Sequence, residues 1–217
     1  MIIAVDGHAA SGKGTFAKRI AQHFGFHYLD TGKLYRAVAL SVLNAGEDPD
    51  NAAAAGAAAA HLELSWLSHP DIELEATGGA ASQVAVHEDV RGALTSFQRD
   101  FGRKPPGAIL DGRDIGTVIC PDAELKFFIT ATAHERALRR LKQLGEDASN
   151  PDRVQAMQAE IEARDHRDQT RAVAPLKPAK DALLLDTTNR DIDAIVEWGV
   201  AEVGKVLAAR NVEAPIT

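Results

Sequence analysis

A glycine-rich segment near the beginning of the chain constrains the fold more than any other feature of the sequence. In it two glycines are separated by four other residues, and a lysine directly follows the second glycine, in the order Gly7, His8, Ala9, Ala10, Ser11, Gly12, Lys13, Gly14, Thr15. Glycines let a backbone curl tightly and turn its N–H groups toward an anion. An apolar run at 2–6 precedes the segment, and apolar residues at helical spacing follow it. A strand, a glycine-rich turn and a helix in this order are typical of a phosphate-binding loop, or P-loop.

Every residue of this loop, from 7 to 15, is therefore a candidate contact of the phosphates of a nucleotide such as ATP. Lys13 would bring a mobile positive charge to the outer phosphates, and the helix that begins there would add the positive end of its dipole. A glycine-rich turn with a solvated lysine is the alternative. We expect no catalytic role for His8, because a lone histidine in an exposed loop is usually an ordinary surface residue.

Short apolar runs alternate with helical patterns along the rest of the chain. Runs without polar alternation suit strands that are buried on both faces of a parallel sheet. The sequence therefore predicts an α/β fold with a five-stranded parallel sheet flanked by helices, and a closing helix over 191–209. The predicted strands lie at 2–6, 26–29, 108–110, 125–129 and 182–185.

Two further regions have patterns of their own. An alanine-rich stretch at 51–61 predicts a helix, since alanine has the highest helix propensity. Two short alternating runs between 62 and 76 predict a small hairpin with its turn at 69–71. Later in the chain, Asn150 and Pro151 have the residue types of an N-cap and a first helical position, so they predict the beginning of a charge-rich helix.

Composition narrows the classes of partner. The formal net charge of −7 argues against a broad basic surface for a nucleic acid polymer, although a few arginines can still form a local positive cleft. Cys120 is the only cysteine, which excludes an intramolecular disulfide and a cysteine-based zinc site and leaves a catalytic thiol as an alternative. The N-terminus does not resemble a signal peptide, and no apolar run reaches about 18 residues, so we expect a cytoplasmic protein without a membrane span.

Two polar clusters on predicted helices could hold a second substrate. Thr31 and Arg36 stand at the beginning of a helix, where a hydroxyl, backbone N–H groups and a guanidinium fork can meet a phosphate. A capped helix with a solvent-facing arginine is the alternative. On the charge-rich helix, Arg164, Asp168 and Arg171 fall on one face. That face could bind a phosphate and a sugar hydroxyl together. The alternative interpretation is a charged helix face that contacts only solvent.

A third cluster, at 111–117, follows the predicted strand at 108–110. Ligands of open α/β sheets bind at the carboxyl ends of the strands, which places this cluster beside the P-loop. Asp111 could hold the water shell of a Mg²⁺ ion near Thr15 without ligating the metal directly. A structural ion pair between Arg113 and Asp114 is the competing explanation for the charges that follow.

Together these segments make the chain resemble the bacterial cytidylate kinases, a family of P-loop nucleoside monophosphate kinases, over nearly its whole length. The motifs that carry the resemblance are Asp6 to Thr15, Leu29 to Gly32 with Tyr35 and Arg36, Ala81 to Ala85 with Val90 and Arg91, Asp111 to Val118 with Pro121 to Ala123, and Arg164 to Leu176. The resemblance implies phosphorylation of CMP and dCMP by ATP with Mg²⁺. It also implies a single monomeric kinase domain over 1–217, with an NMP-binding insertion at about 50–90 and a mobile lid at about 145–171.

The resemblance further implies a role for each matching residue. The CMP site would comprise contacts to the phosphate, contacts to the cytosine edge and contacts to the sugar. In that order its residues are Thr31, Arg36 and Arg113, then Ser82, Arg91 and Asp114, then Arg164 and Asp168, with Arg171 supporting both CMP and its phosphate. The implied catalytic residues are Lys13, Asp111, Arg113 and Arg164.

One departure from the family pattern concerns the insertion. The chain passes from Glu75 through Thr77, Gly78 and Gly79 to Ala81, so a β-rich element that family members often carry is missing and the insertion is shortened. Selectivity among CMP, dCMP and UMP is therefore open. Two other functions remain as alternatives: a kinase for another small acceptor such as UMP, AMP or dephospho-coenzyme A, and a P-loop NTPase switch.

Overall fold

The computed structural model describes residues 1–213, and a parallel sheet lies at its centre. Its strands are β1 (Ile2–Gly7), β2 (His27–Asp30), β3 (Ala108–Gly112), β4 (Leu125–Thr130) and β5 (Leu183–Asp186). They are hydrogen-bonded in the order β2-β3-β1-β4-β5, and every pair is parallel. The predicted five-stranded parallel sheet is confirmed, with each strand within two residues of its expected ends.

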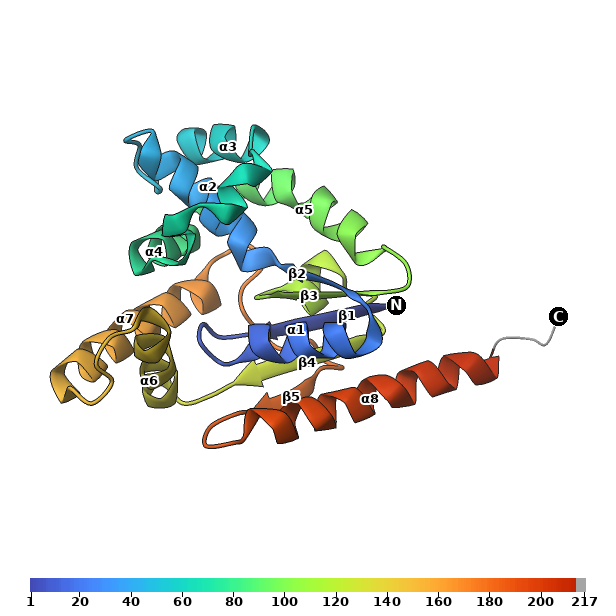
Figure 1. Cartoon of the computed structure of the whole chain (residues 1–217). Helices are drawn as coiled ribbons and strands as arrows, with labels where there is room; N and C mark the ends of the chain where they lie inside the picture. Colours follow the sequence, from blue (N-terminus) through green and yellow to red (C-terminus); the bar gives the residue numbers. More distant parts are fainter. Residues whose placement is uncertain (214–217) are drawn as a thin grey trace.

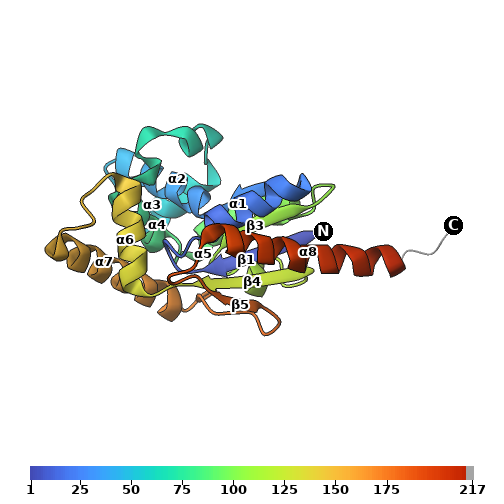
Figure 2. The ribbon, with the colours of Figure 1, turned by 60° about the horizontal axis from the view of Figure 1, so that its bottom comes forward.

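Each face of the sheet buries a separate apolar cluster. Ile3 and Val5 of β1 point toward α1 (Lys13–Phe24) and α8 (Ile192–Glu213), while Ala4 points to the opposite face. That opposite face is covered by α5 (Glu88–Gly102) and by a short π-helix, η3 (Ile115–Ile119). Figure 2 shows α8 running along its face of the sheet. The predicted closing helix is confirmed.

A helical layer with its own core lies between β2 and β3 in sequence. It comprises α2 (Thr31–Asn44), α3 (Ala52–Ala60), α4 (Glu75–Val84) and α5. Small and branched side chains such as Val38, Ala55 and Val84 fill the space between these helices. The alanine-rich helix is confirmed as α3, and Asn51 caps it by accepting hydrogen bonds from two backbone N–H groups.

The predicted hairpin between 62 and 76 is wrong. The segment forms two 3₁₀ helices, η1 (Leu64–Ser68) and η2 (Pro70–Glu73), and the range 50–90 contains no strand, so no β-rich element remains in the insertion. In a strand, residues two apart share a face, yet Ile72 is buried and Leu74 is exposed. Pro70 begins η2, and the ring of His69 accepts a hydrogen bond from the backbone N–H of Asp71 at 3.2 Å.

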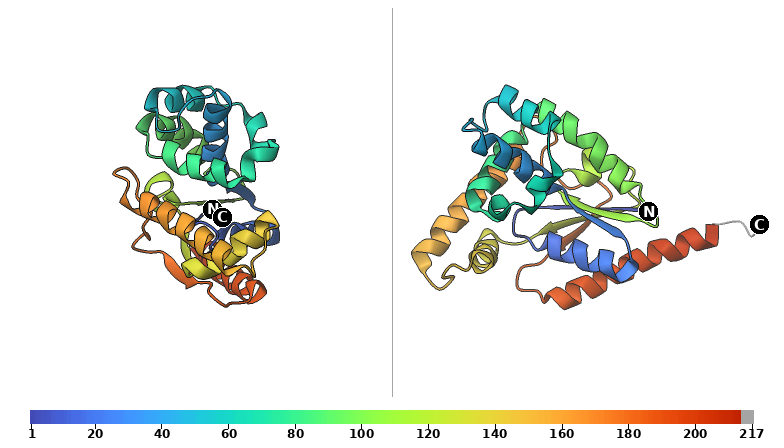
Figure 3. Two further views of the ribbon diagram at one scale, coloured as in Figure 1. Left: turned by 90° about the vertical axis from the view of Figure 1, so that its left-hand side faces the viewer. Right: turned by 45° about the horizontal axis from the view of Figure 1, so that its top comes forward.

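A pair of helices stands at the carboxyl ends of the strands. α6 (Ala133–Leu144) and α7 (Pro151–Thr170) pack on each other through a core that includes Leu141, Met157 and Ile161. Asn150 accepts hydrogen bonds from the N–H groups of Asp152 and Arg153, which confirms the predicted helix start. Seen from this end, the α2–α5 layer and the α6–α7 pair lie on either side of the strand ends (Figure 3). No helix within residues 1–213 is long and apolar enough to cross a membrane.

Candidate active site

The glycine-rich loop lies between β1 and α1 and lines a cavity of about 190 Å³. Gly7 begins the loop at a φ of 153°, and a Cβ there would lie 2.0 Å from the carbonyl oxygen of Ile129, so no side chain fits. Gly12, at a φ of 88°, is the N-cap of α1. Residues from Ala9 to Thr15 form one wall of the cavity, which we call the phosphate cavity. The predicted P-loop geometry, a strand followed by a tight turn and a helix N-terminus, is therefore present.

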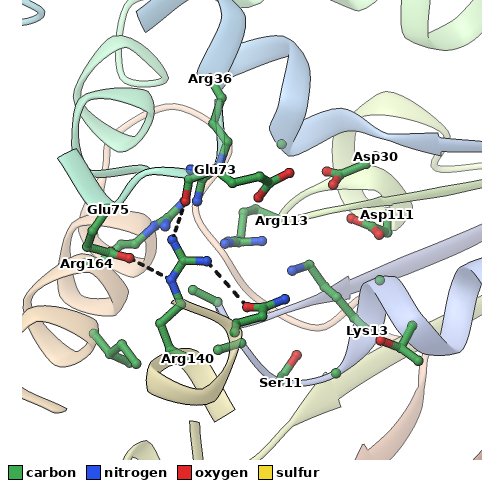
Figure 4. A pocket seen from close by; sticks show the side chains of 18 residues that line it. Ser11, Lys13, Asp30, Arg36, Glu73, Glu75, Asp111, Arg113, Arg140 and Arg164 are labelled. Atoms are coloured by element: carbon green, nitrogen blue, oxygen red, sulfur yellow. Dashed lines mark hydrogen bonds and ion pairs between the residues drawn. The ribbon is translucent and has the colours of Figure 1, made fainter. Parts of the chain in front are cut away.

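Basic side chains from several elements converge on the phosphate cavity (Figure 4). They are Lys13 of α1, Arg36 of α2, Arg113 after β3, Arg140 of α6 and Arg164 of α7. Burial, with a further contribution from Arg113, lowers the pKa of Lys13 to about 8. The same two causes lower the pKa of Arg164 to about 10. Among the described residues the buried Nε of Arg164 has no hydrogen-bond partner, so the cavity favours an anion.

Two carboxylates close the cavity beside the beginning of α1. Asp30 ends β2 and Asp111 lies near the end of β3, and the two residues are paired across the neighbouring strands. The hydroxyl of Tyr28 donates to Oδ2 of Asp111 at 2.7 Å. Burial, followed by the charge of Asp30, raises the pKa of Asp111 to about 6, although Lys13 opposes the shift. Both carboxylates face the P-loop lysine in Figure 4.

These oxygen donors fit a Mg²⁺ ion that is held mainly by nucleotide phosphates and water. Asp111 and Asp30 supply carboxylate oxygens and Thr15 supplies a hydroxyl at the same cavity, which are the ligand types that Mg²⁺ prefers. No group of three or more His, Cys, Asp or Glu residues within 1–213 could hold a metal ion by itself. Any such ion at this site would therefore depend on the bound nucleotide.

A second, smaller pocket of about 40 Å³ adjoins the phosphate cavity, and we call it the acceptor pocket. It gathers side chains from α2, α4, α5, α7 and the segment after β3. Of the residues that the family resemblance assigns to CMP, the acceptor pocket contains Thr31, Ser82, Arg91, Arg113, Asp114, Arg164, Asp168 and Arg171. Arg36 is the exception, because it lines the phosphate cavity instead. Residues far apart in the sequence thus meet at one place.

Ion pairs order the acceptor pocket. Arg113 donates from Nε to Asp168 at 2.9 Å, and the hydroxyl of Ser82 donates to the other oxygen of Asp168, also at 2.9 Å. Asp114 accepts from Arg91 and, at 3.4 Å, from Arg171. The alternative of an Arg113–Asp114 ion pair is therefore wrong. The solvated-face alternative for α7 is also wrong, since Asp168 is only 3% exposed.

Arg36 is held by backbone carbonyl groups, whereas the alternative interpretation of this helix start has a solvent-facing arginine. Its Nη1 donates to the carbonyl oxygens of Ile72 at 2.9 Å and Leu74 at 3.0 Å. Thr31, the first residue of α2, donates its hydroxyl to the carbonyl oxygen of Asp111 at 2.7 Å, and Asp30 serves as the N-cap. The beginning of α2 is thus tied both to β3 and to the 72–74 segment.

The structure also brings to the site two residues, Asp6 and Arg140, that were not among the candidate catalytic and binding residues. Asp6 accepts hydrogen bonds at 2.8 Å from the backbone N–H groups of Ile115 and Gly116, directly after Asp114. Its burial raises its pKa to about 7. Arg140 of α6 pairs with Glu75 of α4 at 2.7 Å across the phosphate cavity. No local pattern distinguishes such residues, because each acts on a segment far away in the sequence.

The fold and the two connected pockets define a P-loop kinase of the nucleoside monophosphate kinase class. Comparison with known proteins gives the family: the model of the cytidylate kinase family matches residues 3–205, and the chain belongs to this family. The resemblance seen in the sequence is confirmed.

Curated relatives carry the same family name. A cytidylate kinase of Rhodopseudomonas palustris is 50% identical over 211 residues, covering 97% of this chain and 99% of that protein. A cytidylate kinase of Nitrobacter winogradskyi is 50% identical over 206 residues, with 95% and 97% covered. Among solved structures, an uncharacterized protein from Eubacterium ventriosum matches with a TM-score of 0.56 at 17% identity, covering 94% of this chain and 98% of that one, which supports the fold alone.

Proposed function

We propose that this protein transfers the terminal phosphoryl group of ATP to CMP and dCMP, forming CDP and dCDP. One observation carries the proposal: Arg113 and Arg164 line both the phosphate cavity and the acceptor pocket. An acceptor held in the pocket would place its phosphate against the same two guanidinium groups that face the P-loop. The identity of about half of all residues with curated cytidylate kinases supports CMP as the acceptor.

On the donor side, the loop residues Gly7 to Thr15 would hold the ATP phosphates through inward N–H groups and the N-terminus of α1. Lys13 would neutralise the outer phosphates. A Mg²⁺ ion beside Asp111, Asp30 and Thr15 would supply charge neutralisation between the phosphates when it is bound. His8 and the rest of the loop would act through the backbone, in line with the absence of any expected catalytic role for the His8 ring.

On the acceptor side, Asp114 is suited to the cytosine edge. Both its oxygens are held by arginines, so its carboxylate is fixed as a hydrogen-bond acceptor for the 4-amino group of cytosine. Arg91 would donate to the ring carbonyl, and Ser82 would donate to the ring nitrogen once its hydroxyl turns away from Asp168. UMP carries a carbonyl oxygen where CMP carries the amino group, and a carboxylate would repel it. Asp168 would accept hydrogen bonds from the sugar hydroxyls.

The transfer itself needs charge neutralisation more than proton abstraction. The phosphate of CMP is already an anionic nucleophile near neutral pH, so its oxygen can attack the γ-phosphorus in line while the bond to ADP breaks. Negative charge then spreads over the transferring group. Arg113 and Arg164 stand between the two pockets and would neutralise that charge, and Arg36 would hold the acceptor phosphate.

The competing class of protein is a P-loop NTPase switch. A kinase forms ADP only when an acceptor is present, whereas an NTPase forms ADP without one. With ATP and Mg²⁺ we expect the purified protein to form ADP rapidly only when CMP is added, with CDP as the second product. A Lys13→Ala variant should fold normally and lose turnover by about 10²–10³-fold, because it removes one charge from the transition state. Steady ADP formation without CMP, or near-normal turnover in the variant, would contradict the proposal.

Magnesium dependence, a monomeric state, a cytoplasmic location and the mobility of residues 145–171 stay predictions. The range 145–171 comprises the whole α6–α7 connection, all of α7 and Arg171, and α7 supplies Arg164 and Asp168. Because α7 carries these residues, any opening of the α6–α7 pair would move two of the proposed CMP contacts. The insertion at about 50–90 would likewise carry Ser82 on α4.

A further inference from the structure

Helix α4 presents bare backbone to two arginines of the phosphate cavity at Gly78. A Cβ on Gly78 would lie 2.7 Å from Nη2 and 3.2 Å from Cζ of Arg36. It would also lie 3.1 Å from Nη1 of Arg164. Real Cβ atoms essentially never approach a neighbour within 2.7 Å, and 3.1 Å is tighter than most real contacts, so a side chain at position 78 would require both guanidinium groups to shift.

Backbone conformation gives no reason for glycine at this position. Gly78 lies inside α4 and is not among the residues with positive φ, a conformation that would favour glycine. Glycine inside a helix destabilises it relative to alanine. Around Gly79, its neighbour in the same helix, a Cβ would meet no described atom within 4 Å, so glycine there is not required by its surroundings. The distinguishing property of Gly78 is the pair of arginines that lies against it.

The two arginines have different supports. Arg36 is anchored from its Nη1 by the carbonyl oxygens of Ile72 and Leu74, while its Nη2 rests against Gly78. Arg164 comes from α7, on the other side of the cavity, and its buried Nε has no partner among the described residues. The charge of Arg36 is one cause of the lowered pKa of Arg164. Glu75 offsets part of the charge of both arginines, and an anion bound between the two guanidinium groups would be attracted by both.

We infer that Gly78 is a positioning residue of the reaction: its missing side chain lets Arg36 and Arg164 converge on one phosphate group, the acceptor phosphate. The inference deepens the proposed function and rests on it. It also gives the shortened insertion a role, since α4 belongs to that insertion and both supports of Arg36 lie in residues 72–78.

A methyl group at position 78 should change function without unfolding the protein. The atoms that it would meet are the far ends of two flexible side chains, not backbone, so they can move away. That movement shifts the guanidinium groups by a fraction of an ångström to about 1 Å, and a misplacement of this size can cost about 10²-fold in rate. The helix itself gains from alanine.

The test compares Gly78→Ala with Gly79→Ala as a matched control. We expect Gly79→Ala to leave both KM values and kcat within about twofold. Gly78→Ala should raise the KM for CMP or lower kcat about ten- to hundredfold, with the KM for ATP nearly unchanged and the thermal midpoint no lower than in Gly79→Ala. Kinetics of Gly78→Ala equal to those of the control would overturn the inference. So would equal losses for both nucleotides together with a lower thermal midpoint.

A double-variant cycle asks whether Gly78 acts through the arginine. In an Arg36→Ala background the closest contact is gone, so Gly78→Ala should cost much less than it does in the natural sequence. Fully additive costs would contradict the positioning role. Calorimetric titration with inorganic pyrophosphate tests the inference by binding alone, without the reaction. If the natural protein formed no CDP, the proposed function would be contradicted, but pyrophosphate binding could still be compared between the variants. Gly78→Ala should still weaken pyrophosphate binding and Gly79→Ala should not.

Discussion

Lys13 lies where burial and Arg113 both disfavour its positive charge, which lowers its pKa from 10.5 to about 8. Near pH 8 the amino group of Lys13 in the free protein is therefore protonated only part of the time. A bound polyphosphate would restore the proton, because an adjacent anion favours the charged form of a lysine. The P-loop lysine thus couples nucleotide binding to proton uptake on the alkaline side of neutrality.

Proton uptake on ATP binding tests this coupling. At pH 8 we expect about half a proton to be taken up per ATP, with the amount falling as the pH drops below 7. Calorimetric titrations in two buffers of different ionisation enthalpy measure it. Lys13→Arg keeps the charge but does not titrate in this range, so the uptake should disappear. Equal uptake in the variant would assign the proton to another group.

Individual residues also show how much of the site could be predicted from the sequence. The loop from Gly7 to Thr15 was predictable, because its chemistry is contained in consecutive residues. The meeting of Ser82, Arg91 and Asp114 was not, since no spacing relates them and only the family resemblance brought them together. An ion pair between Arg113 and Asp114 was the competing explanation of their charges, yet Arg113 pairs with Asp168, 55 positions away. Long-range ion pairs leave no local pattern in a sequence.

At the scale of elements, the strands and the capped helices were predictable and the 62–76 segment was not. Strands buried on both faces and caps such as Asn150 depend on neighbours in sequence. The 62–76 segment has alternating residues, but no strand lies beside it to pair with. Its conformation follows from Pro70 and from the hydrogen bonds of Ile72 and Leu74 to Arg36, a contact made only in the folded protein.

The relation of α4 to α7 carries a prediction about motion. The acceptor pocket between them has room for about three water molecules, which is too little for a nucleotide. We therefore expect CMP alone to move α4 and α7 apart by about 2 Å or more. Spin labels on Ala76→Cys and His166→Cys, both exposed positions, would report the distance. The natural Cys120 is buried, so we expect it not to react with the labelling reagent. An unchanged distance with bound CMP would mean that side chains alone make the room.

At the scale of the whole molecule, a chain with a net charge of −7 concentrates positive charge at one edge of its sheet. The α2–α5 layer contributes Arg36, the α6–α7 pair contributes Arg140 and Arg164, and the strand ends contribute Lys13 and Arg113. We expect an acidic exterior with a cluster of basic side chains in the interior site to favour small anions over nucleic acid polymers. The arrangement depends on both helical groups, so neither one forms the site alone.

The central claim is that the acceptor pocket selects cytidylate, and an acceptor series measures this most directly. With ATP and Mg²⁺ fixed, kcat/KM is determined for CMP, dCMP, UMP and AMP. We expect CMP to exceed UMP and AMP by at least about tenfold, with dCMP also a substrate, because Asp114 accepts from the 4-amino group. Asp114→Asn should narrow the gap between CMP and UMP. Equal use of all four acceptors, or a preference for AMP, would contradict the claim.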